Sequence, residues 1–205
     1  MSTNEYPLPY LDDFILNLKA NNFSEETAYN YERDLKTFET FLSNDIKKSF
    51  DSINKTDILR FKAYLSSSER RTAEDKKPEK KLNSYSINRI LSSMRSYLKF
   101  MEDMDHKSPI SSNAIKLLKN EKKSARVPEF EQLIKLIEAP TKYEEKAQVA
   151  LRNRALLETL FATGMRISEL LSLKVEQIDQ TGKIYIMGKG KKQRFVYLTP
   201  RALIH

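Results

Sequence analysis

One arginine stands out because of the residues around it. Residues 162–173 read ATGMRISELLSL, so Arg166 follows a glycine turn and opens an apolar helix. Further along, residues 186–194 read IMGKGKKQR, a basic turn between two short strand-like segments. An arginine flanked by packed residues is held in place and presents its planar fork to a phosphate. Facing a lysine on a turn, it would make the kind of site that handles a DNA phosphate.

Arg166 has a second interpretation. Glu169 lies one helical turn further along and is placed either to buttress the guanidinium or to form a purely structural ion pair with it. The sequence around Arg166 leaves both interpretations open.

The basic turn is built around Lys189. Gly188 and Gly190 flank this lysine and permit backbone angles that allow close approach to a ligand. The side chains of Lys191 and Arg194 add positive charge and are candidate DNA contacts. A lysine at such a tip is placed to protonate a leaving oxygen, whereas the alternative is a solvated tight turn.

The composition limits which partners the protein can bind and which kinds of catalytic or metal site it can contain. The 205 residues carry 36 Lys and Arg against 28 Asp and Glu, a net charge of +8, which favours nucleic acid over membrane as a partner. A merely lysine-rich protein is the alternative. The absence of cysteine excludes a disulfide framework, a thiolate zinc site and a cysteine nucleophile. With only two histidines in the sequence, a histidine-rich metal site is excluded as well.

The sequence also bears on localisation. The N-terminus lacks the basic-then-apolar order of a signal peptide, and no apolar run is long enough to span a bilayer, so a cytoplasmic protein is expected.

Apolar spacing predicts helices through most of the chain. In the first half they cover residues 8–20, 24–42, 56–65 and 85–103, with Ser24 as an N-cap. In the second half, one helix follows Pro128 and ends at Ala139-Pro140, another spans 147–162 with Gly164 as its C-cap, and a third starts at Ile167. Period-two alternation predicts strands over 183–187 and 195–198. The expected fold is therefore mainly α, with a small antiparallel sheet in an α+β second half.

Two stretches interrupt these patterns. Residues 66–81 are polar and charged without apolar period, and they are expected to form a solvated loop. Residues 108–127 lie in a turn-like and then strongly basic segment, which is expected to be an interdomain linker. We therefore expect a helical domain over 1–107 and a second domain over 128–205.

Two predicted helices carry a polar face that suits DNA. Small polar residues interleaved with cations let a helix approach a groove while the cations reach phosphates. On the fourth helix these residues are Asn88, Arg89, Ser92, Ser93, Arg95, Ser96 and Lys99, and on the second they are Asn30, Arg33 and Lys36. An ordinary solvated face is the alternative for each helix taken alone.

Taken together, these motifs resemble the tyrosine recombinases (the phage integrase family), most closely the Xer-type site-specific recombinases. The similarity is strongest in residues 162–170 and 188–194, and the segments 86–89 and 91–97 resemble the fourth helix of the family's core-binding domain. Ser24, Thr27 and Tyr31 fall where that domain has its second-helix signature. The resemblance implies a four-helix SAM-like core-binding domain followed by an incomplete α+β catalytic domain.

The resemblance also implies roles for two residues. Arg166 matches the arginine that grips the scissile phosphate, and Lys189 matches the general acid toward the leaving 5′ oxygen. The implied reaction joins DNA to a tyrosine through a 3′-phosphotyrosyl link and needs no metal or cofactor. The implied partners are double-stranded DNA, held by both domains, and a homo- or hetero-tetramer on that DNA.

The chain departs from the family pattern in one respect. The second arginine with its histidine partners and the nucleophilic tyrosine have no match up to His205, so we expect these 205 residues to bind DNA without cleaving it. The alternative is a non-catalytic DNA-binding regulator that occupies recombination sites, and the gene beyond position 205 would separate the two. A general helical interaction module with incidental basic charge is a further alternative.

Overall fold

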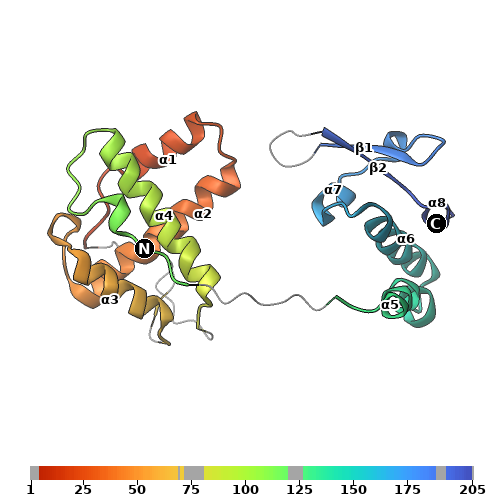
Figure 1. Cartoon of the computed structure of the whole chain (residues 1–205), viewed down its shortest axis with the longest axis horizontal. Helices are drawn as coiled ribbons and strands as arrows, with labels where there is room; N and C mark the ends of the chain where they lie inside the picture. The colour runs from red at the N-terminus through yellow and green to blue at the C-terminus, as the bar shows by residue number, and fades with distance from the viewer. Residues whose placement is uncertain (1–4, 69, 72–80, 120–126, 188–192, 205) are drawn as a thin grey trace. The chain divides into compact units, whose positions relative to one another are not determined.

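The computed structural model describes residues 5–68, 70–71, 81–119, 127–187 and 193–204. Its elements fall into two compact units, one spanning Met1–Lys123 and the other Ser124–His205 (Figure 1).

The described part of the first unit is helical, as expected. Its α-helices are α1 (Leu11–Ala20), α2 (Glu25–Phe41), α3 (Lys55–Ser66) and α4 (Ser84–Asp103). Shorter turns are η1 (Leu42–Ile46), η2 (Phe50–Ser52) and η3 (Ser112–Ala114).

Side-chain caps fix where two of these helices begin. The Ser24 side chain accepts a hydrogen bond from the Thr27 N–H at 3.2 Å, which confirms the predicted N-cap of α2. Asn54 and Asp57 form a capping box at the start of α3, so the backbone N–H groups of Asn54, Thr56 and Asp57 are satisfied by side chains.

Helix α4 is the centre of the first unit and packs against α1, α2 and α3 (Figure 1). Its predicted apolar stripe is buried, with Leu91 and Leu98 fully inaccessible, and it meets Phe14 of α1, Leu35 of α2 and Phe61 of α3 in one core. The polar residues of α4 are therefore positioned by a rigid, well-packed element.

The first unit extends beyond the boundary expected at residue 107. Ile110 and Ile115, which the sequence places in the linker 108–127, are buried in the same core. Two isoleucines five positions apart, in a stretch with several serines and one proline, give no helical periodicity, so the pattern did not predict their burial. Residues 120–126 of the expected linker and 72–80 of the expected loop 66–81 lie outside the described residues.

The second unit combines helices with a hairpin. Its helices are α5 (Phe130–Tyr143), α6 (Ala147–Thr163), α7 (Ile167–Leu171) and α8 (Pro200–Leu203), with the turn η4 (Val175–Gln177) and the strands β1 (Lys183–Met187) and β2 (Gln193–Tyr197). The prediction that the first of these helices ends at Ala139-Pro140 is wrong. Proline removes one backbone donor, but the turn after it is closed by the Glu144 N–H, which donates to the Pro140 carbonyl at 3.0 Å.

The hairpin is a two-stranded antiparallel sheet in which Lys183 pairs with Tyr197 and Met187 with Gln193. Ile184 and Ile186 point from β1 into a small core with Met165 and Leu170. This core joins the hairpin to the segment that carries Arg166. The expected fold class, mainly helical with a small antiparallel sheet, is confirmed.

Within the part of the chain that the structure describes, no helix combines the length and the apolar character needed to span a bilayer.

Candidate functional site

Arg166 lies at a sharp change of direction between α6 and α7. Gly164 ends α6 with φ 58°, the left-handed conformation that was predicted for this glycine. Arg166 is then the extended N-cap residue of α7. Its neighbour Met165 is buried, but Ile167 is exposed and so is the Arg166 side chain. The expectation that packed neighbours on both sides hold this arginine is therefore wrong.

Glu169 holds Arg166 instead. The Arg166 backbone N–H donates to Glu169 Oε2 at 2.7 Å, and Arg166 Nη1 donates to Oε1 at 2.9 Å. The predicted pair therefore exists, and its bonds fix both ends of the arginine. Among the described residues, the guanidinium uses Nη1 for Glu169, and the Arg166 side chain is 59% exposed, so further N–H donors of the fork are accessible to a partner.

Arg194, at the start of β2, reaches the same carboxylate. Its Nη2 donates to Glu169 Oε2 at 2.7 Å and its Nη1 to Oε1 at 3.2 Å, a bidentate pair. The hydrogen bonds from Arg194, followed by those from Arg166, lower the pKa of Glu169 from 4.5 to about 2. Two guanidinium groups thus share one carboxylate, and the cluster keeps one positive charge in excess. We call Arg166, Glu169 and Arg194 the arginine cluster.

The hairpin register links the arginine cluster to the basic turn. Arg194 pairs across the sheet with Ile186, and Gln193 pairs with Met187, the last residue before the turn. The predicted residues Lys189 and Lys191 belong to that turn and lie outside the described residues. Beside Glu169, Tyr185 and Met187 help to line a small cavity of about 140 Å³.

In the first unit, the candidate residues of α2 interact with one another and with their own helix. The Asn30 side chain donates to Glu26 and accepts from Arg33 Nη2 at 2.9 Å. Lys36 forms an ion pair with Glu32 one turn away. These contacts orient the cations along the helix surface and leave the Lys36 side chain 46% exposed.

Two candidate residues of α4 bind the chain that follows it. The Asn88 amide accepts from the Leu118 N–H at 2.7 Å and donates to the Leu118 carbonyl at 2.9 Å. Arg95 Nη2 donates to the Ile115 carbonyl. Both side chains therefore tie the segment 115–118 to α4, a role that the polar pattern of the helix did not reveal.

Arg89 pairs with a carboxylate that the sequence did not single out. Its Nη1 donates to Oδ2 of Asp34 on α2 at 2.6 Å, and Asp34 is buried. Ser93, expected on the polar face, is buried too and donates to the same oxygen. Of the remaining candidates on this helix, Ser92 is half-buried and Lys99 exposed.

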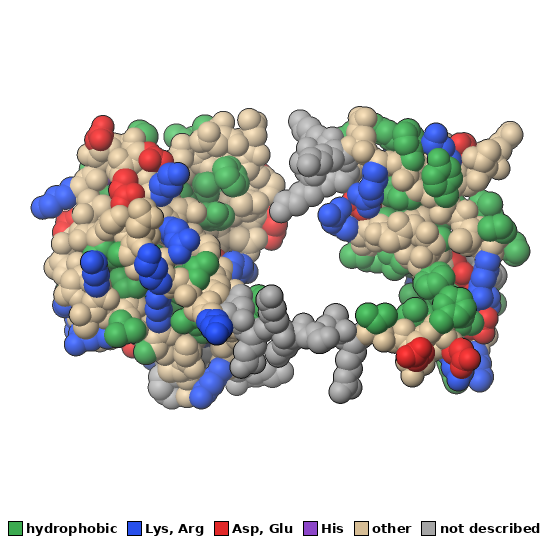
Figure 2. Space-filling view, in the orientation of Figure 1, with side chains coloured by type: hydrophobic (Ala, Val, Ile, Leu, Met, Phe, Trp, Pro, Cys, Tyr) green, Lys and Arg blue, Asp and Glu red, His purple; other side chains and the backbone are tan. Residues whose placement is uncertain are grey.

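Lys62 of α3 is a cation that the sequence analysis missed. Burial and the neighbouring Arg95 guanidinium lower the pKa of Lys62, so α3 and α4 bring two positive groups near each other. Figure 2 shows several Lys and Arg side chains on the face of the first unit that is turned to the viewer. Only the packing of the two helices reveals this proximity.

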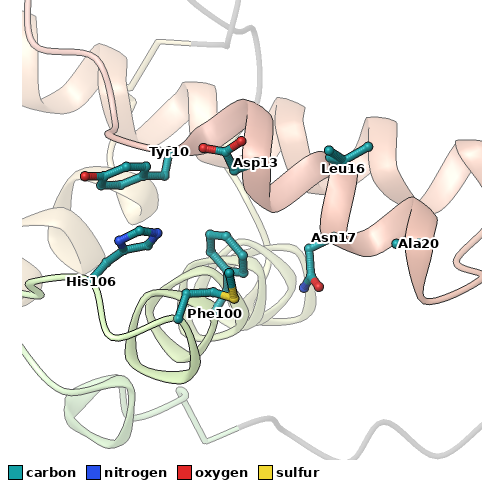
Figure 3. Close-up of a pocket in the computed structure, with 8 residues that line it drawn as sticks. Tyr10, Asp13, Leu16, Asn17, Ala20, Phe100 and His106 are labelled. Atoms are coloured by element: carbon teal, nitrogen blue, oxygen red, sulfur yellow. The ribbon is translucent and has the colours of Figure 1, made fainter.

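An apolar cavity of about 380 Å³ opens between α1 and the end of α4 (Figure 3). Leu16, Phe100 and Met104 help to line it, and at its rim the rings of Tyr10 and His106 stack with centroids 3.8 Å apart. None of the predicted site residues that the structure describes lines this cavity.

Both units match family models. Residues 11–104 match "Phage integrase, N-terminal SAM-like domain", and residues 126–205 match "Phage integrase family". The match boundaries fall within the two compact units of the structure.

Curated proteins similar in sequence to this chain are named tyrosine recombinases. The tyrosine recombinase XerC of Natranaerobius thermophilus is 34% identical over 197 residues, which cover 93% of this chain and 60% of that protein. The tyrosine recombinase XerD of Oceanobacillus iheyensis is 30% identical over 195 residues, covering 92% of this chain and 59% of its own length. The chain thus spans about three fifths of the length of these relatives.

A solved structure has a similar fold. The pre-cleavage complex of the XerH site-specific recombinase bound to difH substrate matches with a TM-score of 0.64 at 23% identity, over 95% of this chain and 53% of that one. With both units matched by family models and relatives at 30% identity or more, the chain belongs to the tyrosine recombinase (phage integrase) family.

Proposed function

We propose that this chain is part of a cytoplasmic tyrosine recombinase that acts in site-specific recombination of double-stranded DNA, cleaving and rejoining strands through a 3′-phosphotyrosyl link. Its relatives are named tyrosine recombinases. The observation that carries the proposal is the arginine cluster, which holds an exposed guanidinium beside the hairpin that leads to Lys189.

In the proposed reaction, a tyrosine oxygen bonds to the scissile phosphorus while the bond to the 5′ oxygen breaks. Arg166 binds the non-bridging oxygens, on which negative charge builds, through the donors that Glu169 leaves free. Lys189 gives its proton to the leaving 5′ oxygen. A hydroxyl group from another strand then displaces the tyrosine, so the phosphodiester bond is restored without an external energy source.

DNA binding is proposed for both units. In the first unit the contacts come from the polar faces of α2 and α4, and in the second from Lys191 and Arg194. Part of that surface also binds its own chain, because Asn88 and Arg95 hold residues 115–118. We further propose that four protomers, of one kind or two, assemble on DNA in the complete reaction.

These 205 residues alone should bind duplex DNA without cleaving it, because no tyrosine in them is assigned as the nucleophile. The test is a salt titration of duplex binding together with a nicked suicide substrate that traps phosphotyrosyl adducts. Affinity should fall steeply with salt, as phosphate contacts require, and no adduct should form.

Arg166→Ala tests the site itself. It should weaken duplex binding and reduce the salt slope by about one, the effect of losing one phosphate contact. Arg152→Ala is the matched control, since Arg152 is an exposed arginine of α6 outside the arginine cluster. Equal effects of the two substitutions would contradict a phosphate role for Arg166, and an adduct on the suicide substrate would contradict the predicted inactivity.

A further inference from the structure

Helices α2 and α4 are joined by a buried charged interaction. Asp34 of α2 is 2% exposed, yet it meets Arg89 and Ser93 of α4 on a single oxygen, Oδ2, at 2.6 Å and 2.9 Å. Ser93 Oγ also lies 3.2 Å from the Arg89 carbonyl, so the serine lies close to the arginine's own turn of helix. These contacts bring together residues more than fifty positions apart in the chain.

The two ends of this interaction differ in their exposure. The Asp34 side chain is 3% exposed and the Arg89 side chain 46%. Arg89 uses Nη1 for the carboxylate, and a guanidinium carries five N–H donors in a rigid plane. A buried carboxylate therefore holds one corner of the fork, while the rest of the group lies at the surface of α4.

We infer that Asp34, with Ser93, is a positioning residue that fixes the Arg89 guanidinium for contact with a DNA phosphate. This inference rests on the proposed function, because Arg89 must contact DNA for its positioning to count. Holding the fork in advance reduces the rotamer freedom that Arg89 would otherwise lose on binding.

Charge alone predicts the opposite effect for Asp34. A carboxylate next to a phosphate-binding surface repels DNA, so its removal should strengthen binding if electrostatics were its only influence. Burial raises the pKa of Asp34, and the nearby cations Arg89 and Arg33 partly offset that rise. The two models therefore predict opposite changes in DNA affinity when the Asp34 carboxylate is removed. Positioning predicts weaker binding, and simple repulsion predicts tighter binding.

The test compares duplex binding by the 205-residue chain carrying Asp34→Asn, Arg89→Ala or both, with a fluorescein-labelled duplex of mixed sequence as the probe. Arg89→Ala should reduce the salt slope by about one. Asp34→Asn should weaken binding about two- to tenfold, the range expected when one rotamer-rich side chain must be immobilised on binding, although the substitution makes the chain more positive. In the Arg89→Ala background, Asp34→Asn should cause no further loss.

Two controls separate positioning from damage to the fold. Asp57→Asn removes another buried carboxylate of the first unit, which pairs with Lys48 and Arg60 rather than with Arg89. It should leave DNA affinity within about twofold wherever circular dichroism shows a folded chain. Ser93→Ala removes one of the two bonds to Oδ2 without changing the charge, and it serves if Asp34→Asn does not fold.

The outcomes are distinct. If Arg89→Ala leaves affinity and salt slope unchanged, the proposed DNA contact of Arg89 is wrong. If Arg89→Ala weakens binding but neither Asp34→Asn nor Ser93→Ala does, the contact stands and the positioning role is wrong. An equal loss from Asp34→Asn with and without Arg89 also overturns the inference, because the effect would not pass through that guanidinium.

Discussion

At the scale of single residues, Glu169 organises the arginine cluster. It binds Arg166 three positions before it and Arg194 25 positions after it, and its own side chain is only 9% exposed. One carboxylate between two arginines fixes both forks and still leaves the cluster positive. The sequence left open whether Glu169 forms a structural pair with Arg166 or buttresses a phosphate-binding arginine. The observed bonds are compatible with both roles.

The pKa of Glu169 leads to a prediction about acid stability. Because the folded pKa is lowered from 4.5 to about 2, the ion pairs stabilise the fold above pH 4.5, and this stabilisation is lost as the pH falls toward 2. Glu169→Gln should therefore lower the melting temperature at neutral pH, with a deficit relative to the wild type that shrinks as acid is added.

The measurement is the melting temperature of the wild type and of Glu169→Gln from neutral pH down to about pH 3. Glu176→Gln, an exposed carboxylate of η4 in the same unit, is the control and should show a smaller deficit at every pH. A Glu169→Gln deficit that stays constant through the acid range would show that the lost stability does not come from the ionised carboxylate.

At the scale of elements, α4 packs the core with one face and binds polar partners with the other. Its apolar stripe was predictable because its residues repeat at helical spacing, and all six are buried: Ile87, Ile90, Leu91, Met94, Leu98 and Met101. The sequence also predicted that the opposite face is polar, but it did not predict which groups that face binds. Asn88 binds Leu118 across a sequence separation of 30, and Ser93 turns inward to Asp34. Such contacts depend on how helices pack, which periodicity does not encode.

The contact between Asn88 and Leu118 predicts local protection of the segment after α4. Asn88→Ala removes both hydrogen bonds to the Leu118 backbone, so the Leu118 amide should exchange with solvent about tenfold faster or more, from the net strength of one to two such bonds. Hydrogen exchange followed by NMR measures this directly. Ser92→Ala, one turn further along the same helix, should leave the exchange rate of Leu118 unchanged, and an equal effect would mean that α4 itself has loosened.

In the second unit, too, contacts between distant elements could not be predicted from local sequence signals. The glycine C-cap, the helix after it and both strands follow from local signals, and so does the pairing of Arg166 with Glu169. The bidentate bond from Arg194 does not, because it requires the hairpin to fold back onto α7. The continuation of α5 through Pro140 was also missed, since a proline is a strong local stop signal that neighbouring hydrogen bonds override here.

At the scale of the whole molecule, the two units differ in how much apolar surface they bury. The first has one large core around α4, whereas the core of the second is centred on Met165, Leu170, Ile184 and Ile186. Several large apolar side chains of the second unit are exposed, among them Phe130, Leu136, Tyr143, Val175 and Ile204. Since folding stability comes mainly from apolar burial, the second unit should be the less stable.

Two core substitutions test this difference. Leu65 and Ile184 are each fully buried, the first in the α4 core and the second in the hairpin core. Leu65→Ala and Ile184→Ala should each cost about 2–5 kcal/mol in the unit that contains the residue. Hydrogen exchange at increasing urea, read separately for 5–119 and 127–204, should show that the second range opens at lower urea in the wild type. Each substitution should then shift only its own range, because Leu65 and Ile184 belong to different hydrophobic clusters, and a common shift of both ranges would mean that the two units unfold as one.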